Sequence, residues 1–324
     1  MKNTKIIPVW GKILRGHRPF LSIEITRECP LRCPGCYAYE PSHLPGNLPL
    51  RQLADLKGEA LIEGVLGLVC RYRPVWLSIV GGEPLVRYRE LDVLLPKLHT
   101  MQVEVQLVTS AVRAIPAGWT DIPTLHLVVS VDGLPPEHDR RRAPATYERI
   151  LKSIEGHHLN VHCTITGLMA RRERYFEQFA AFWSECEAVR RIWFSLYTPQ
   201  EGDSSVERLQ PDDRLKVLDE LRRIRHQFPK IELPDRVLDG FYQPPDSPAQ
   251  CIFAQVTTSL SANLSTRITP CQFGGRPVCH ECGCVASAAM ASIARYRIGG
   301  LLPVSRIFAA SKKIGDSLHR GMVN

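Results

Sequence analysis

The chain has 324 residues, a mass of 36.5 kDa and a formal net charge of +8 at pH 7, and 44% of its residues are hydrophobic against 23% that are charged. This composition excludes a disordered chain, a collagen and a coiled coil, and no apolar run approaches the roughly 18 residues that a membrane-spanning helix needs. Eleven cysteines, clustered and without a recognisable secretion signal, favour metal thiolates in a reducing cytoplasm over disulfides.

The first segment, residues 1–19, is basic. It holds no acidic residue and five basic ones, Lys2, Lys5, Lys12, Arg15 and Arg18. A basic end of this kind can bind an anionic partner such as lipid or nucleic acid, or it can have no partner.

Short β-branched runs then alternate with amphipathic segments. The predicted strands are 21–26, 75–80, 103–110, 125–131, 161–166 and 192–198. The predicted helices are 50–70, 88–101, 145–157, 174–189 and 211–228. Apolar runs of this length between helical patterns are typical of buried parallel strands, so the sequence predicts an α/β fold, a partial (β/α)6 TIM-like barrel.

The composition changes near residue 235. Residues 233–250 are rich in Pro and Asp and are predicted to form a linker, and residues 251–284 hold five cysteines. We therefore predict a barrel domain over 20–235 and a small, cysteine-rich C-terminal domain over 236–324.

Cys29, Cys33 and Cys36 form a C-x3-C-x2-C cluster directly after the first predicted strand, at the end where barrel active sites are built. Three thiolates in eight residues suit a zinc ion, with a fourth ligand close by. They also suit a cubic [4Fe–4S] cluster that keeps one iron free for a substrate. The spacing alone leaves both interpretations open.

This spacing, the Tyr37 that follows it and the strand before it resemble the radical S-adenosylmethionine (radical SAM) superfamily. The resemblance implies a [4Fe–4S] cluster whose iron without a cysteine ligand binds SAM. It implies reductive cleavage of SAM to methionine and a 5′-deoxyadenosyl radical, which abstracts hydrogen from a substrate. An external electron donor of the flavodoxin or ferredoxin type is implied as well.

A second match closes the strand 75–80, where Gly81, Gly82, Glu83 and Pro84 follow one another. Glycines let a backbone approach a ligand closely, and Glu83 offers a carboxylate to an ammonium group. Taken alone, such a turn is more often only a turn. The segment is similar to the Gly-Gly-Glu-Pro loop of the family, which implies contact with the SAM amino group.

A third match ends the fourth predicted strand. Ser130 and Asp132 are two residues apart and therefore share a strand face. The resemblance implies contact with the SAM ribose, while the alternative is that Asp132 caps the next turn. The following segment resembles a His-Asp-x-x-Arg pattern of the family, which implies that Arg142 pairs with the SAM carboxylate. Its neighbours Arg140 and Arg141, or a merely solvated basic run, are the alternatives.

The C-terminal cysteines are Cys251, Cys271, Cys279, Cys282 and Cys284. Their segment resembles the start of the auxiliary-cluster domains called SPASM and twitch. The resemblance implies one auxiliary [4Fe–4S] cluster on Cys251, Cys271, Cys279 and Cys282, with Cys284 as an alternate ligand. Five cysteines are too few for two fully liganded clusters, and a structural zinc site is the competing interpretation.

The tail, residues 286–324, mixes apolar and basic residues. Ile307, Ile314 and Leu318 fall on one face of a predicted helix. With the basic N-terminal segment, this face predicts either peripheral contact with the inner face of an anionic membrane or a helix packed on the barrel. No nucleic-acid motif is present, so nucleic acid is excluded as a partner.

The sequence thus predicts a radical SAM enzyme. The basic ends motivate a small-molecule substrate of the lipid or isoprenoid type, and the resemblance to auxiliary-cluster enzymes motivates a peptide. The alternative is an iron–sulfur or zinc-binding scaffold that does not cleave SAM, against which the intact Gly-Gly-Glu-Pro loop argues.

Overall fold

The structure, a computed structural model, describes residues 11–294, 297–298, 302–303 and 317. Its centre is a parallel sheet in the order β6-β5-β4-β3-β2-β1-β7. The strands are β1 (Phe20–Glu24), β2 (Trp76–Val80), β3 (Glu104–Thr109), β4 (Leu125–Ser130), β5 (Leu159–Ile165), β6 (Val189–Leu196) and β7 (Thr257–Leu260). A separate antiparallel pair is formed by β8 (Arg297–Ile298) and β9 (Leu302–Pro303).

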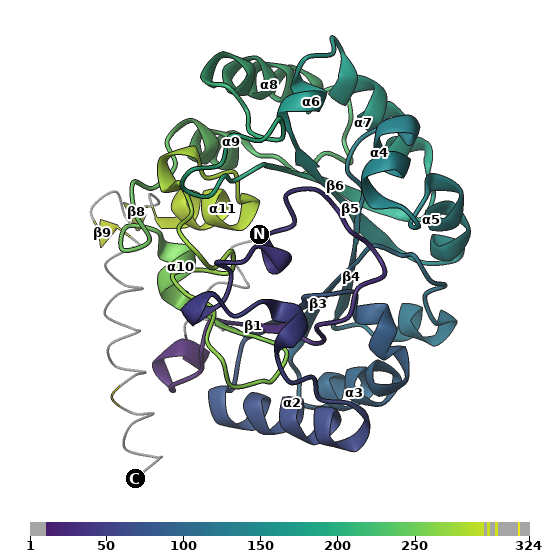
Figure 1. The fold of residues 1–324 in the computed structure, drawn as a ribbon, viewed down its shortest axis with the longest axis vertical. Helices are drawn as coiled ribbons and strands as arrows, with labels where there is room; N and C mark the ends of the chain where they lie inside the picture. Colours follow the sequence, from purple (N-terminus) through teal and green to yellow (C-terminus); the bar gives the residue numbers. More distant parts are fainter. Residues whose placement is uncertain (1–10, 295–296, 299–301, 304–316, 318–324) are drawn as a thin grey trace.

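Helices lie around the outside of the curved sheet (Figure 1). They are α2 (Gly58–Tyr72), α3 (Tyr88–Thr100), α4 (Pro135–Arg142), α5 (Tyr147–Ile154), α6 (Gly167–Ala170), α7 (Tyr175–Glu185), α8 (Pro211–Ile224), α9 (Asp235–Tyr242), α10 (Ile252–Val256) and α11 (Val285–Ala294). The sheet does not close, because β6 and β7 stand at its two edges. The predicted partial TIM-like barrel is confirmed, and all six predicted strands are present.

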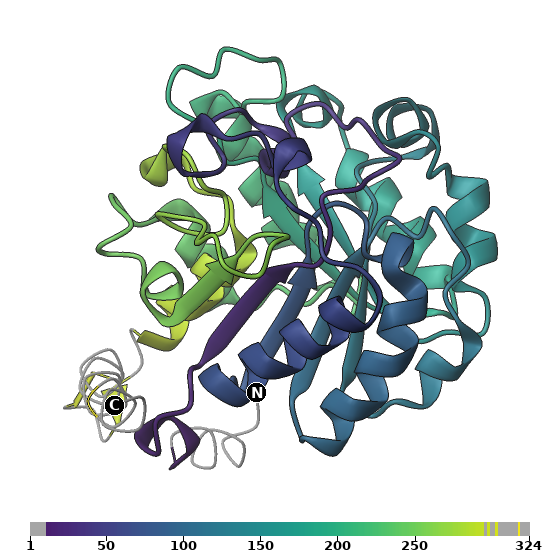
Figure 2. The ribbon, with the colours of Figure 1, turned by 60° about the horizontal axis from the view of Figure 1, so that its bottom comes forward.

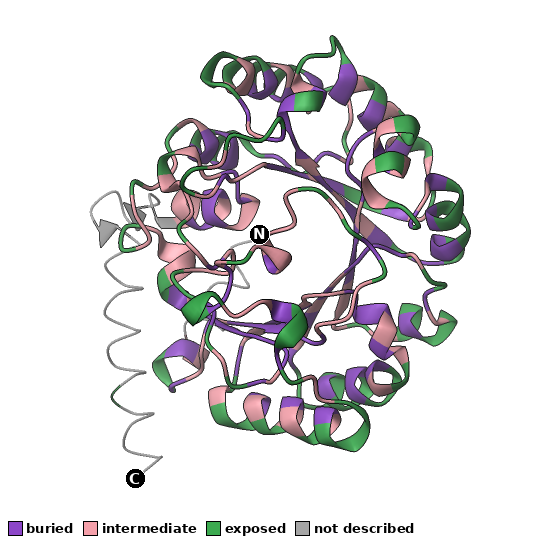
Figure 3. Cartoon of the chain, viewed as in Figure 1, coloured by how far each residue is buried: buried purple, intermediate pink, exposed green. Residues whose placement is uncertain are grey.

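The two faces of the sheet differ in chemistry because side chains alternate along each strand. The outer face packs on the helices and is apolar; it includes Leu77, Ile79, Val105, Leu107, Leu127, Val129, Val161 and Phe194. The inner face is mostly polar and half-buried; it includes Ser78, Gln106, His126, Ser130, Asn160, His162 and Thr164. Figure 3 shows the buried residues concentrated along the strands and on the helix sides that meet them.

The C-terminal segment 236–324 contributes more to this sheet than the sequence indicates. Its strand β7 pairs in parallel with β1, with Phe20 opposite Thr257 and Ile23 opposite Leu260. This seventh strand was not predicted, because TTSL is short and only weakly apolar.

The predicted linker 233–250 is wrong in part, since α9 occupies Asp235–Tyr242. Val237, Leu238 and Phe241 form a buried helical face that the surrounding Pro and Asp residues obscure in the sequence. This helix packs against α11 so closely that a Cβ at Gly240 would lie 2.8 Å from the Ala288 Cα.

None of the helices within the described ranges is long and apolar enough to cross a membrane. The predicted apolar face at Ile307, Ile314 and Leu318 lies outside the described residues, as do Lys2 and Lys5. Peripheral membrane contact and a cytoplasmic location therefore stay predictions.

Candidate functional site

The segment that carries Cys29, Cys33 and Cys36 leaves β1 and crosses over the upper ends of the strands in Figure 2. The three thiols are half-buried, and the Cys36 N–H donates to the Cys33 carbonyl at 3.3 Å. Burial, with the Glu83 carboxylate and the other two thiols nearby, raises the pKa of Cys29 to about 11. Burial also raises the pKa of Cys36, so a bound positive centre favours the thiolate form of Cys29 and Cys36.

The Gly81-Gly82 turn lies directly against the start of this loop. Both glycines have a positive φ, 76° and 56°. A Cβ on Gly81 would overlap the Glu24 side chain, and one on Gly82 would overlap the carbonyl oxygens of Glu28 and Thr26. The Glu83 N–H donates to the Glu28 carbonyl at 2.8 Å. The glycines thus let β2 end in contact with the residue before Cys29.

Glu83 is buried, and its carboxylate accepts four hydrogen bonds from neighbouring residues. Its carboxylate accepts from the Leu85 N–H at 2.9 Å, from the Thr109 hydroxyl, and from the N–H and the hydroxyl of Ser110 at 2.8 and 2.5 Å. These bonds tie the ends of β2 and β3 together, a role that the sequence analysis missed. Pro84 follows, buried, as the first residue of a short 3-10 helix. Contact of this loop with the SAM amino group stays a prediction.

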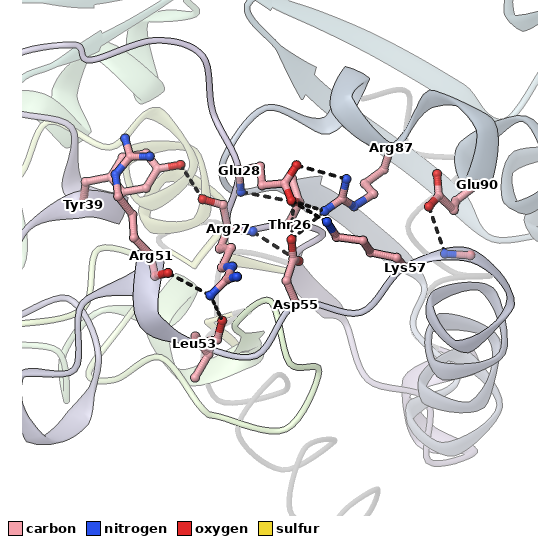
Figure 4. Close-up of polar contacts among 11 residues, drawn as sticks. Thr26, Arg27, Glu28, Tyr39, Arg51, Leu53, Asp55, Lys57, Arg87 and Glu90 are labelled. Carbon is pink, nitrogen blue, oxygen red and sulfur yellow. Dashed lines mark hydrogen bonds and ion pairs between the residues drawn. The ribbon is translucent and has the colours of Figure 1, made fainter.

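A partly buried ion-pair network holds the other side of the loop (Figure 4). The Arg87 guanidinium contacts Asp55 at 2.5 Å and Glu28 at 3.1 Å. Asp55 also accepts from the Thr26 hydroxyl at 3.0 Å. Hydrogen bonds from Arg87 and Lys57 lower the pKa of Glu28 to about 2. Glu28, one residue before Cys29, is therefore fixed through its carboxylate as well as its carbonyl group.

Asp132 and Arg142 meet at the carboxyl end of β4. Arg142 Nη1 donates to Asp132 Oδ2 at 2.8 Å, and the Thr164 N–H donates to Asp132 Oδ1 at 3.1 Å. Although burial alone would raise the pKa of Asp132, the guanidiniums of Arg142 and Arg141 hold it well below its usual range. Burial would lower the pKa of Arg142, but the Asp132 carboxylate raises it, and Cys33 and Cys36 of the cysteine loop add to this rise. The structure thus brings Asp132 and Arg142 to the cysteine loop.

The other predicted residues of this corner are Ser130 and the arginines next to Asp132. Ser130 ends β4 on the inner face, half-buried. Arg141 contacts Glu207 at 2.5 Å and Asp132 at 3.3 Å, so its charge is already balanced within the chain. Arg142 also pairs with Asp132, at 2.8 Å, but its buried Nε has no hydrogen-bond partner among the described residues.

His138 supports this corner as a neutral, fully buried ring. Its Nδ1 accepts from the Asp132 N–H at 3.0 Å, and its Nε2 therefore donates to the Ala145 carbonyl at 2.8 Å. Burial, together with the charge of Arg142, lowers its pKa from 6.5 to about 4. The His138 side chain thus links the end of β4 to the loop between α4 and α5.

We expect the stability of the protein to fall as the pH drops from 6.5 towards 4, because the unfolded chain binds a proton at His138 more readily than the folded one. Between pH 7.5 and 5.5 the loss from this group is on the order of 1 kcal/mol. His138→Gln should flatten this dependence, measured as urea midpoints at the two pH values. A variant midpoint that falls as steeply as that of the wild type would contradict the assignment.

The C-terminal cysteines come together on the same side of the sheet. Burial, with Cys282, Cys251 and Cys279 nearby, raises the pKa of Cys271 to about 12. Burial and the same neighbours Cys282 and Cys251 raise that of Cys279 to about 11. Cys271, Cys279 and Cys282 thus lie within electrostatic reach of one another or of Cys251.

Cys284 is placed differently from these four. It is buried, accepts from the Gln272 side chain at 3.4 Å, and immediately precedes α11. Cys282 and Cys271 are the thiols nearest to it.

Tyr37 lies between the two cysteine groups. Its ring packs edge-on against Phe273, with centroids 5.3 Å apart, and against His43 at 5.7 Å. Burial, next to Glu24 and the thiols of Cys36, Cys284 and Cys271, raises the pKa of Tyr37 far above its usual range. The residue that follows the first cluster motif thus contacts the C-terminal segment.

No group of three His, Cys, Asp or Glu side chains within the described ranges converges on a single-ion site. A cubic [4Fe–4S] cluster instead takes its thiolates at separate iron atoms. Three spaced cysteines on one loop and four neighbouring cysteines in the C-terminal segment fit this donor set.

Comparisons with known proteins bear on the family of the chain. The model of the radical SAM superfamily matches residues 23–182. The 7-carboxy-7-deazaguanine synthase of Hyperthermus butylicus is 30% identical over 135 residues, 40% of this chain and 53% of the synthase. The GTP 3′,8-cyclase of Helicobacter pylori is 33% identical over 94 residues, 28% of this chain and 26% of the cyclase. The chain thus spans about half or less of the curated relatives it matches.

Solved structures share the fold. Streptococcus suis SuiB bound to precursor peptide SuiA has a TM-score of 0.58 at 14% identity, covering 76% of this chain and 58% of SuiB. The enzyme anSMEcpe with bound AdoMet has a TM-score of 0.59 at 15% identity, covering 83% of this chain and 79% of that chain. At these identities the likeness concerns the fold alone.

Proposed function

Because residues 23–182 make this chain a member of the radical SAM superfamily, we propose that it cleaves SAM reductively and abstracts hydrogen from a substrate. Cys29, Cys33 and Cys36 are the proposed ligands of the catalytic [4Fe–4S] cluster. The observation that carries this proposal is the convergence of the cysteine loop, the Gly81-Gly82 turn and Arg142 at one end of the sheet.

The bound cluster would supply the electron for SAM cleavage, and the protein's own residues would bind and orient SAM. Arg142 is suited to the SAM carboxylate, because its buried Nε lacks a hydrogen-bond partner among the described residues and because Cys33 and Cys36 lie within its electrostatic reach. Ser130 and Asp132 are proposed for the ribose. Tyr37 and the loop from Gly81 to Pro84 are proposed to line the rest of the site.

The C-terminal segment 236–324 is proposed to bind one auxiliary [4Fe–4S] cluster through Cys251, Cys271, Cys279 and Cys282. The grouping of these four thiols supports the assignment. Members of the superfamily need an electron donor, and we propose a flavodoxin or a ferredoxin.

For the substrate we favour a peptide over an isoprenoid-type lipid. The inner face of the sheet below the cysteine loop presents Ser78, Gln106, Asn160 and His162. Burying such groups against a hydrocarbon chain leaves their hydrogen bonds unmade, whereas peptide amides satisfy them. Burial lowers the pKa of His162 to about 4, so this ring is uncharged at neutral pH. SuiB, which shares the fold, is bound to a precursor peptide.

Reduced, anaerobically reconstituted protein is expected to convert SAM slowly to 5′-deoxyadenosine without added substrate. Cys33→Ala should abolish this product. Cys70→Ala is the matched control, since Cys70 is an exposed cysteine on α2. Chromatography of the nucleoside products measures the outcome, and equal turnover by Cys33→Ala and wild type would refute the proposal.

A further inference from the structure

Glu24 and His43 form a buried pair that the proposed chemistry does not use. Each side chain is at most 1% exposed, and His43 Nε2 lies 2.7 Å from Glu24 Oε1. His43 Nδ1 lies 2.9 Å from the Phe273 carbonyl oxygen, which can only accept. Both ring nitrogens therefore face acceptors, and the ring carries two N–H donors.

The partners of this pair come from three distant parts of the chain. Glu24 ends β1, His43 follows the first cysteine loop, and Phe273 lies two residues after Cys271. The second Glu24 oxygen accepts from the Ser261 hydroxyl at 2.5 Å, just beyond β7. The Glu24 carboxylate thus bonds to His43, which follows the cysteine loop. It reaches the C-terminal segment directly at Ser261 and, through His43, at Phe273.

The backbone packs just as closely around this pair. A Cβ on Gly274 would overlap the His43 carbonyl group, and one on Gly275 would lie 2.7 Å from both the Ser42 hydroxyl and the Gln200 side chain. The Phe273 ring packs on Tyr37 at 5.3 Å. Residues 273–275 therefore pack tightly against residues that follow the first cysteine cluster.

We propose that Glu24 and His43 are positioning residues that seat the segment 261–275, and with it Cys271, against the first cysteine loop. The pair supplies two of the polar anchors of this segment, through Ser261 and Phe273. Removing one partner leaves a buried charge without compensation, which is strongly destabilising, whereas a half-exposed pair of the same kind contributes little. The significance for an auxiliary cluster rests on the proposed function, but the seating itself does not.

The chain offers a matched control in His126 and Glu104. Their atoms also lie 2.7 Å apart, but the two side chains are 37% and 41% exposed and lie on the inner face of the sheet, on β4 and β3. His43→Gln and His126→Gln thus remove the same ring from a buried and from a half-exposed pair.

The test is hydrogen exchange of reconstituted, full-length protein, read by mass spectrometry. In His43→Gln, amides of residues 261–275 should exchange at least tenfold faster than in wild type, while β3 to β5 stay protected. His126→Gln should leave residues 261–275 unchanged. Unaltered exchange of this segment in His43→Gln would overturn the proposal.

Glu24→Gln provides a second variant if His43→Gln does not fold, because it keeps an acceptor for Ser261 and the same size. It should accelerate exchange in the same residues. Iron analysis separates the two proposals. A wild type with only four irons per chain would contradict the auxiliary cluster, whereas the exchange result decides the seating in either case.

Discussion

Gly82→Ala is expected to abolish 5′-deoxyadenosine formation and to release the iron of the first cluster. The new Cβ would overlap the carbonyl oxygen of Glu28 and lie 2.6 Å from that of Thr26, both of them backbone atoms that cannot turn aside. The left-handed backbone costs about 1–2 kcal/mol for alanine, and the overlap adds about 1–3 kcal/mol. Because Glu28 precedes Cys29, this displacement falls on the cluster ligand.

Gly156→Ala is the matched control. Gly156 has a φ of 75°, but a Cβ there meets nothing within 4 Å. This variant should lose about 1 kcal/mol of stability through backbone strain alone and keep its iron and its activity. Thermal melts, iron analysis and nucleoside assays on both variants decide the question, and full iron content in Gly82→Ala would show that the close approach is dispensable.

Cys282→Ala is expected to lower the iron content by about four atoms per chain, whereas Cys284→Ala should retain about eight. Cys251, Cys271 and Cys279 all have Cys282 or one another as neighbouring thiols. Cys284 is buried at the start of α11 and is bonded by Gln272. Without Cys282 one iron of the proposed auxiliary cluster loses its thiolate, and we expect this cluster to be lost.

Iron and sulfide determination after anaerobic reconstitution measures both variants. The opposite pattern, with loss in Cys284→Ala and retention in Cys282→Ala, would make Cys284 the fourth ligand. If both variants instead contain zinc and keep the iron content of the wild type, the C-terminal cysteines bind a structural zinc ion.

Local pattern was sufficient to predict much of the fold. The six strands from β1 to β6 and the helices α2, α3, α5, α7 and α8 follow from apolar periodicity, whereas α4 and α6 were not predicted. The strand β7 could not be predicted in this way, because TTSL is short. The helix α9 could not be predicted either, because its apolar residues Val237, Leu238 and Phe241 lie among prolines and acidic residues.

The residues of the site likewise fall into those that the sequence predicts and those that it does not. Cys29, Gly82 and Arg142 stand in motifs that a sequence displays directly. The buried pair of Glu24 and His43 and the three bonds from Thr109 and Ser110 to Glu83 depend on residues far apart in the chain. Such contacts between distant residues cannot be predicted from local spacing, because each residue taken alone is compatible with an exposed position.

The pairing of β7 with β1 has a consequence for the order in which the protein is assembled. During synthesis β1 emerges well before β7, and one of its two edges stays unpaired until residues 257–260 have left the ribosome. An unpaired edge is a template for association between nascent chains. The sheet is therefore completed by its longest-range pairing, a closure that is intrinsically slow.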